Sequence, residues 1–145
     1  MDIATLTAAQ LLRLYRARKL SPVEVTKAVY DRIGALDPAH NAFCVLKPEE
    51  ALEAARASEA RWANGRPAGL VDGIPATIKD QWPVKGWGWR RGSRTTSPDE
   101  VAPDDAPAVA RLREEGAILL GKTTDRKSTR LNSSHSQQSR MPSSA

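Results

Sequence analysis

Cysteine and histidine are almost absent from this chain of 145 residues. The single cysteine is Cys44, so no disulfide can form within the chain and no cysteine cluster can bind zinc. The two histidines are His40 and His135, so a catalytic histidine would have to be one of these. With so few of the usual ligands, we expect neither a metal site nor a cofactor.

Long apolar runs are also lacking. No stretch of about 18 apolar residues occurs, and residues 1–5 do not have the basic and apolar regions of a secretory signal. Hydrophobic residues make up 40% of the chain and charged residues 27%, which excludes collagen-like, coiled-coil and fully disordered proteins. We therefore expect a cytoplasmic protein that does not bind a membrane.

Serine is scarce before residue 125 and abundant after it. The first 124 residues contain four serines, whereas the last 21 contain seven. Back-translated with one choice of codons, residues 125–135 and 138–145 both resemble an adapter used in short-read sequencing, in one frame and in the correct order. We therefore expect residues 1–124 to be the N-terminal portion of a longer domain, and residues 125–145 to be a non-native, disordered tail.

The net charge of +5 is concentrated in the same C-terminal segment. Residues 125–145 contribute +3, which leaves +2 for residues 1–124. Tryptophans and basic residues alternate around residues 82–94, a composition that can bind single-stranded nucleic acid. Because the remaining charge is small, we favour tryptophans that pack on the domain and arginines that face solvent, and we expect no nucleic-acid partner.

Local patterns in residues 1–124 predict alternating helices and strands. Thr7–Gln10 and Ser21–Glu24 have the capping-box pattern, so helices are expected from there to about Lys19 and to Asp37-Pro38. The second helix is predicted to bury Val25, Ala28, Val29, Ile33 and Leu36. Further elements are expected in this order: a strand at 42–46, a helix at 48–64, a strand at 74–78, a helix capped by Asp105 and closed by Gly116, and a strand at 117–120. This order is typical of an α/β fold.

The string from Gly116 to Thr123 matches the spacing of a phosphate-binding loop, with two glycines followed by Lys122 and Thr123. In such a loop the residues between the glycines form a pliable turn that follows a strand. Here they are apolar and follow a helix, which favours a helix end and a core strand. A nucleotide-binding protein remains the alternative from a different functional class.

The sequence around Lys79 makes this lysine a candidate functional residue. Alone, Lys79-Asp80 at a strand end would be interpreted as a solvated surface pair. However, Gly73-Ile-Pro-Ala-Thr-Ile-Lys-Asp80, together with the block from Asp105 to Thr123, resembles the N-terminal part of the amidase signature family. The resemblance covers about residues 3–124, and it includes the two helices that begin the chain. It implies the N-terminal part of an α/β/α sandwich, with a mixed sheet flanked by helices.

The resemblance implies hydrolysis of a small-molecule carboxamide by a triad of a serine, a second serine in a cis peptide, and a lysine. Lys79 occupies the position of the family's catalytic lysine, which must be neutral to accept a proton and therefore shielded from water. Neither serine has a counterpart here, since Ser93 and Ser97 fall outside the motif. The resemblance thus predicts an amidase as the parent protein and an inactive fragment. It gives neither the amide substrate nor the oligomeric state.

A second enzyme with related chemistry fits the same motifs. The A subunit of a tRNA-dependent amidotransferase belongs to this family, and it is the alternative that we retain. The tryptophan-rich segment 81–89 is more similar to that of a free-standing amidase.

Overall fold

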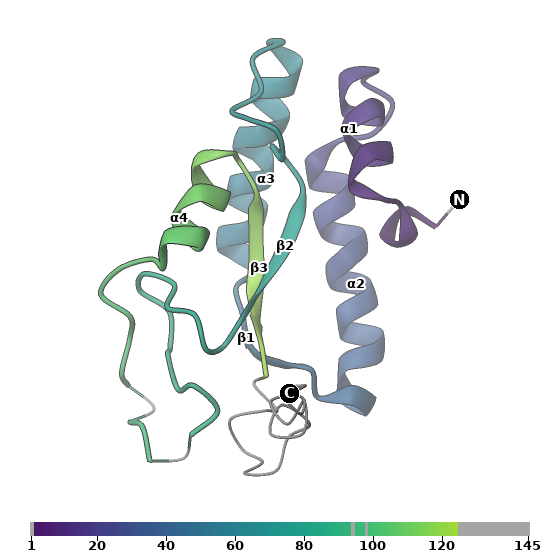
Figure 1. The fold of residues 1–145 in the computed structure, drawn as a ribbon. Helices are drawn as coiled ribbons and strands as arrows, with labels where there is room; N and C mark the ends of the chain where they lie inside the picture. The colour runs from purple at the N-terminus through teal and green to yellow at the C-terminus, as the bar shows by residue number, and fades with distance from the viewer. Residues whose placement is uncertain (1, 94, 98, 125–145) are drawn as a thin grey trace, which may run out of the picture.

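The computed structural model describes residues 2–93, 95–97 and 99–124. After a short 3-10 helix at Ile3–Thr5, its elements are α1 (Ala8–Arg16), α2 (Pro22–His40), β1 (Phe43–Leu46), α3 (Pro48–Ala63), β2 (Pro75–Lys79), α4 (Pro107–Glu114) and β3 (Ile118–Thr123) (Figure 1). The tail expected at residues 125–145 lies outside the described residues, so that expectation stays a prediction.

The strands form a mixed sheet in the order β1-β3-β2. Strand β3 lies in the centre, antiparallel to β1 and parallel to β2. Pro75 is the first residue of β2, where its missing N–H costs no ladder bond. Both pairings contain an irregularity, between Phe43 and Val45 and between Ala76 and Thr77.

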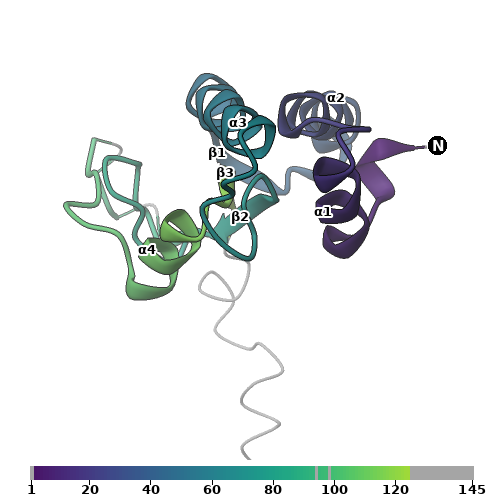
Figure 2. The same ribbon diagram turned by 90° about the horizontal axis from the view of Figure 1, so that it is seen from above.

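Helices cover both faces of the sheet, which agrees with the predicted α/β class. Ile118 and Leu120 of β3 pack with Ala51 and Ala55 of α3, on the face where Figure 2 shows α2 and α3 side by side. Leu119 of β3 packs on the other face, with side chains of β2, of the 81–104 segment, of α4 and of the residue that precedes α4: Ile78, Val84, Trp87, Val109 and Ala106. A third cluster joins α1 to α2 through Leu11, Tyr15 and Val25.

Both capping boxes predicted from the sequence are present. The Thr7 hydroxyl accepts from the amide of Gln10, whose side chain accepts from the amide of Thr7. Ser21 and Glu24 make the same reciprocal bonds, with Pro22 at the first position of α2. These local bonds satisfy amides that the first turn of a helix leaves unpaired.

The end predicted for α2 was wrong. The helix continues through Pro38 to His40 and ends at Asn41, which has a left-handed backbone with φ +49°. Pro38 lies in the last turn, and the Asp37 carboxylate accepts from the amides of Ala42 and Phe43 just beyond it. The predicted buried face was also too long, since Leu36 is 45% exposed.

The cap predicted for α4 was wrong as well. The residue that precedes the helix is Ala106, and its side chain makes no capping bond. The Asp105 carboxylate instead accepts from the amide of Lys85 at 2.7 Å and pairs with Arg113 at 2.9 Å. Asp105 therefore ties the 81–104 segment to α4, and Gly116, with φ +82°, follows the helix as predicted.

None of the helices in the described part of the chain is both long enough and apolar enough to span a bilayer.

Candidate active site

Lys79 is the last residue of β2, and its side chain is half-buried. Its Cα pairs with that of Thr123, the last residue of β3, so the two parallel strands end together. The backbone of Asp80 continues this pairing, because its amide donates to the carbonyl of Thr123 at 2.9 Å. In sheets with parallel strands, ligands bind beyond the carboxyl ends of the strands, and Lys79 lies at such an end.

Two glycines fix the opposite ends of the same strands. Gly73 has φ +81°, and a Cβ there would lie 2.8 Å from the Ser58 hydroxyl. Gly116 has φ +82°, and a Cβ there would lie 2.6 Å from an Asp72 carboxylate oxygen. The amide of Gly73 donates to the carbonyl of Gly116 at 3.0 Å. Both glycines of the recognised motifs are thus required by backbone conformation and close packing. From this end the register of β2 and β3 shifts by one residue between Ala76 and Thr77, and beyond the shift Lys79 pairs with Thr123.

The side chain of Lys79 is held close to its own strand end. Its Nζ donates to Oε1 of Gln81 at 3.3 Å. The backbone carbonyl of Gln81 accepts from the indole N–H of Trp89 at 3.1 Å, and the Arg91 guanidinium lies 4.6 Å from the centre of the Trp89 ring. A chain of contacts therefore connects Lys79 to the tryptophan-rich segment.

Asp80 is not the solvated residue that an isolated Lys-Asp pair suggests. It is 3% exposed, and its carboxylate binds the ammonium of Lys122 at 2.8 Å. The other carboxylate oxygen accepts from the amide of Gly92 at 3.0 Å. Lys122 is 0% exposed and donates a further hydrogen bond to the carbonyl of Gly88 at 2.9 Å. Sequence reasoning missed this pair, although a lysine in an apolar strand is a signal, because lysine is rarely buried without a partner.

The phosphate-loop pattern is explained by strand packing. Gly121, Lys122 and Thr123 belong to β3, and the preceding apolar residues are buried strand residues, as the sequence pattern favoured. A Cβ on Gly121 would collide with the carbonyl oxygen of Val45 on β1, so close strand approach requires the glycine. The ammonium of Lys122 is buried and already binds the Asp80 carboxylate and the Gly88 carbonyl, so it is not available to bind a phosphate.

The tryptophan-rich segment was expected to pack its tryptophans on the domain, and the structure confirms this for some of them. Trp87 is buried at 2% exposure and donates its indole N–H to the Glu50 carboxylate at 2.9 Å. Trp89 is half-buried, whereas Trp82 is 51% exposed. Arg91 faces solvent, as expected, but its guanidinium also stacks on Trp89.

The remaining candidate residues form no second centre. Cys44 lies in the apolar strand β1, a position that favours a core residue, but it is exposed. Burial of part of the thiol, together with the Asp80 charge, raises the pKa of Cys44, which disfavours a nucleophilic thiolate. His40 is exposed. Within residues 2–93, 95–97 and 99–124, no group of three or more histidine, cysteine, aspartate or glutamate side chains is placed to hold a metal ion.

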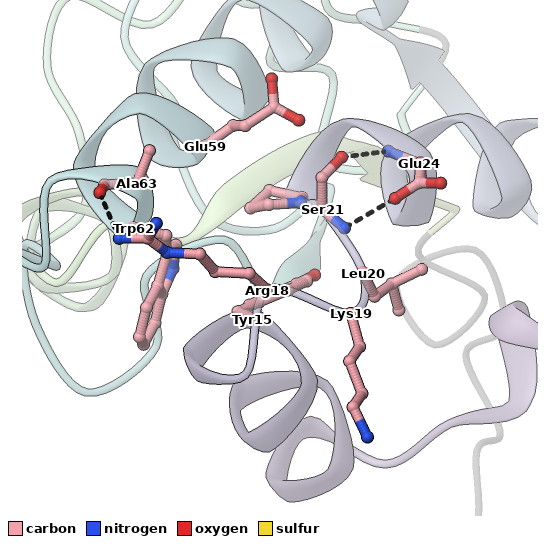
Figure 3. A pocket seen from close by; sticks show the side chains of 10 residues that line it. Tyr15, Arg18, Lys19, Leu20, Ser21, Glu24, Glu59, Trp62 and Ala63 are labelled. Atoms are coloured by element: carbon pink, nitrogen blue, oxygen red, sulfur yellow. Dashed lines mark hydrogen bonds between the residues drawn. The ribbon is translucent and has the colours of Figure 1, made fainter.

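A cavity of about 420 Å³ lies away from Lys79, where α1, the start of α2 and the end of α3 meet. Figure 3 shows its lining, which includes Arg18, Ser21, Glu24 and Trp62. Several of its polar groups are already paired: Arg18 donates to the carbonyl of Ala63 at 2.8 Å, and Ser21 and Glu24 form the capping box. This cavity is a junction between helices rather than part of the Lys79 site.

Comparisons with known proteins match most of the chain. A family model described as Amidase matches residues 24–139. The A subunit of glutamyl-tRNA(Gln) amidotransferase from Acidothermus cellulolyticus is 39% identical over 122 residues, which cover 84% of this chain and 24% of that protein. The chain thus spans about a quarter of the length of the curated relatives that it matches.

Solved structures agree with the observed fold. A peptide amidase from Stenotrophomonas maltophilia is 34% identical, with a TM-score of 0.75 over 83% of this chain and 25% of that chain. A bacterial aryl acylamidase described as an amidase signature enzyme is 29% identical, with a TM-score of 0.78 over 85% of this chain and 26% of that chain. The helices and mixed sheet seen here are therefore the arrangement found in these enzymes.

Proposed function

Because the chain belongs to the amidase signature family, we propose that it is the N-terminal part of an amidase and supplies Lys79 as the catalytic lysine. The observation that carries the proposal is the place of Lys79 at the shared carboxyl end of β2 and β3, within the string that resembles the family's lysine motif. The substrate is a small-molecule carboxamide, and the enzyme acts in the cytoplasm.

The proposed chemistry needs two serines in addition to Lys79. The first serine attacks the amide carbonyl, and its proton passes through the second serine to the neutral amine of Lys79. The C–N bond then breaks, and the nitrogen leaves as ammonia or an amine after it receives that proton. Water hydrolyses the acyl-serine ester to a carboxylate, and the triad is restored. In this scheme Lys79 acts as the general base and then the general acid.

The described residues support one part of this triad. Lys79 is half-buried and hydrogen-bonded to Gln81, so its amine is held near the strand end. Ser93 is engaged locally, because its hydroxyl shares a hydrogen bond with Thr95 at 2.7 Å and accepts from the Thr95 amide. We assign the nucleophile and the bridging serine to a segment other than residues 2–93, 95–97 and 99–124, and we expect the 145-residue chain alone to lack amidase activity.

The test begins with the coding sequence. The locus should be sequenced beyond codon 124 with a read that does not end in adapter, and the complete open reading frame should be expressed. Ammonia release from a panel of carboxamides then measures activity. Lys79→Met keeps the apolar stem and removes the amine, so kcat should fall by at least about 10²–10⁴-fold. Lys27→Ala, at an exposed position on α2, is the control and should retain activity. An active Lys79→Met enzyme would refute the assignment.

The second candidate is the A subunit of an amidotransferase that acts on glutamyl-tRNA(Gln). It is favoured by the curated relatives with that name, which are 38–42% identical, whereas the solved amidases are 28–34% identical. The complete protein should be assayed for amide transfer to glutamyl-tRNA(Gln) as well as for release of ammonia from free amides. Transfer that depends on added partner subunits would support this candidate, and hydrolysis by the isolated protein would support the first.

A further inference from the structure

The ion pair of Lys122 and Asp80 differs from the other pairs that the structure describes, because both of its side chains are buried. They are 0% and 4% exposed, whereas the pair of Arg61 and Asp72 has one partner at 35%. Removing two charges from water is costly, and apolar replacements of a buried pair are often equally stable. Stability alone therefore does not explain the pair, and its position in the sheet indicates a second role.

The pair joins three segments beside the proposed catalytic lysine. Asp80 directly follows Lys79, Lys122 directly precedes the Cα partner of Lys79 on β3, and both side chains bind the backbone of the 81–104 segment. The Lys122 ammonium donates to the carbonyl of Gly88, and the Asp80 carboxylate accepts from the amide of Gly92. One pair thus fixes the end of β2, the end of β3 and two points of the segment that also carries Trp89.

Strand alternation separates this pair from Lys79 itself. Lys122 pairs with Ile78, which packs in the cluster of the α4 face. Successive residues of a strand point to opposite faces, so Lys79 is directed to the other face of the sheet. The pair therefore lies on the α4 face of the sheet. The Lys79 amine lies on the opposite face, where it contacts Gln81.

We propose that the buried Lys122–Asp80 pair is the positioning device of the active site, which holds the Lys79 amine in place by fixing the ends of β2 and β3 to the 81–104 segment. This role rests on the proposed amidase function. Neither residue contacts the reacting atoms in this scheme, so both are positioning residues. The same role accounts for Lys122, the residue before the last in the string that resembles a phosphate loop.

The test uses the double variant Asp80→Asn/Lys122→Met, because a single change would leave one buried charge unpaired and could unfold the chain. The asparagine side-chain carbonyl can still accept from the Gly92 amide, and the methionine fills the space of the lysine stem. A matched control, Arg61→Met/Asp72→Asn, removes the pair near the opposite end of β2. Circular dichroism and thermal melting establish that each variant is folded.

The first measurement needs no activity. Trace acetylation of the 145-residue chain with acetic anhydride, followed by mass spectrometry, gives the reactivity of Lys79 relative to the exposed Lys27. In the folded Asp80→Asn/Lys122→Met variant, the relative reactivity of Lys79 should rise roughly fivefold, the factor expected for the loss of one hydrogen bond. The control pair should leave this ratio unchanged. An unchanged ratio in the folded test variant would overturn the proposal, whether or not the complete protein is an amidase.

The second measurement uses the complete enzyme. Misplacement of a catalytic group by about 1 Å can lower the rate by about 10²-fold, so the test variant should lose kcat by that factor while KM changes little. A merely destabilised enzyme would instead lose active fraction with temperature and keep kcat per folded molecule. Higher Lys79 reactivity with unchanged kcat would overturn the proposal that catalysis depends on this positioning. Absence of activity in the unmodified enzyme would count against the proposed function, and the acetylation result would still decide the positioning.

Discussion

The hydroxyl of Tyr15 donates a hydrogen bond to the carbonyl of Gly73 at 3.0 Å, across 58 positions of sequence. Tyr15 lies on α1 and is 1% exposed, and Gly73 begins the string that leads to Lys79. The Tyr15 ring also packs against Trp62 of α3, with 5.9 Å between ring centres. Helix α1 is therefore part of the support of β2, although it lies far from Lys79 in sequence.

Tyr15→Phe tests this contact. The substitution keeps the ring packing but leaves the buried carbonyl of Gly73 without its partner, so we expect a loss of about 1–3 kcal/mol in the free energy of unfolding. Urea denaturation monitored by circular dichroism measures it. Ser97→Ala, at an exposed position, is the control. Equal midpoints for Tyr15→Phe and the unmodified chain would show that the hydrogen bond contributes no net stability.

Two tyrosines should make the chain sensitive to alkaline pH. Burial raises the pKa of Tyr30 to about 12, and burial together with the Asp72 charge raises the pKa of Tyr15 still further above its usual value of 10.0. A raised pKa in the folded state means that the unfolded chain loses these protons first, so stability is complete below about pH 10 and falls as the pH rises above it.

The unfolding free energy should therefore be lower at about pH 11 than at about pH 8. In Tyr15→Phe/Tyr30→Phe the fall should be smaller, because the two groups that lose protons on unfolding are gone. Urea midpoints at the two pH values measure the difference. An identical fall in both proteins would assign the alkaline loss to other groups.

The sequence predicted elements that depend on local signals. The capping boxes at Thr7 and Ser21 and the glycine after α4 involve residues within a few positions of one another, and all three are present. The predictions failed where a side chain uses a distant partner. Asp105 was assigned to a helix cap, but its carboxylate binds Lys85 and Arg113. The choice between these partners depends on tertiary packing, which the local pattern does not contain.

The candidate site shows the same division. Lys79 was selected because its motif is contiguous, and its predicted place at the end of a strand is confirmed, whereas its catalytic role stays a prediction. The pairing of Asp80 with Lys122 joins residues on different strands, and β2 and β3 become neighbours only in the folded sheet. The predicted end of α2 was wrong for a local reason. A proline in the last turn removes only one hydrogen bond of the helix, and the Asp37 carboxylate accepts hydrogen bonds from the amides just beyond it.

The pair of Arg61 and Asp72 should support the chain at neutral pH and less so in acid. Asp72 is 0% exposed and accepts two hydrogen bonds from Arg61, at 2.9 and 2.6 Å. Burial alone would raise the pKa of Asp72, but hydrogen bonds from Arg61 and the Ala68 amide outweigh it and lower the pKa below its usual 3.8. Because the pKa is lowered in the folded state, this stabilisation is present above about pH 4 and is lost as the pH falls further.

Arg61→Met should remove most of this support. The buried carboxylate of Asp72 then keeps the Ala68 amide but loses its charged partner, so we expect the unfolding free energy at neutral pH to fall by about 1–3 kcal/mol. Arg111→Met breaks the pair with Glu114, in which both side chains are exposed, and should change stability by less than about 0.5 kcal/mol. Equal losses in the two variants would show that burial of Asp72 adds nothing to its pairing.

Two glycine-to-alanine substitutions should have opposite effects. Gly121 lies in β3, where a Cβ would collide with the carbonyl oxygen of Val45 and approach Cα of Leu46 at 3.1 Å. Backbone cannot move aside without separating β1 from β3, so Gly121→Ala should lower the unfolding free energy by about 1–3 kcal/mol. Gly34 lies within α2 with nothing in reach of a Cβ, and alanine there should raise stability by about 0.5–1 kcal/mol. Thermal melting of both variants measures the contrast. Stabilisation of the chain by Gly121→Ala would mean that β1 does not pack on β3 in solution as closely as the register of Val45 and Lys122 requires.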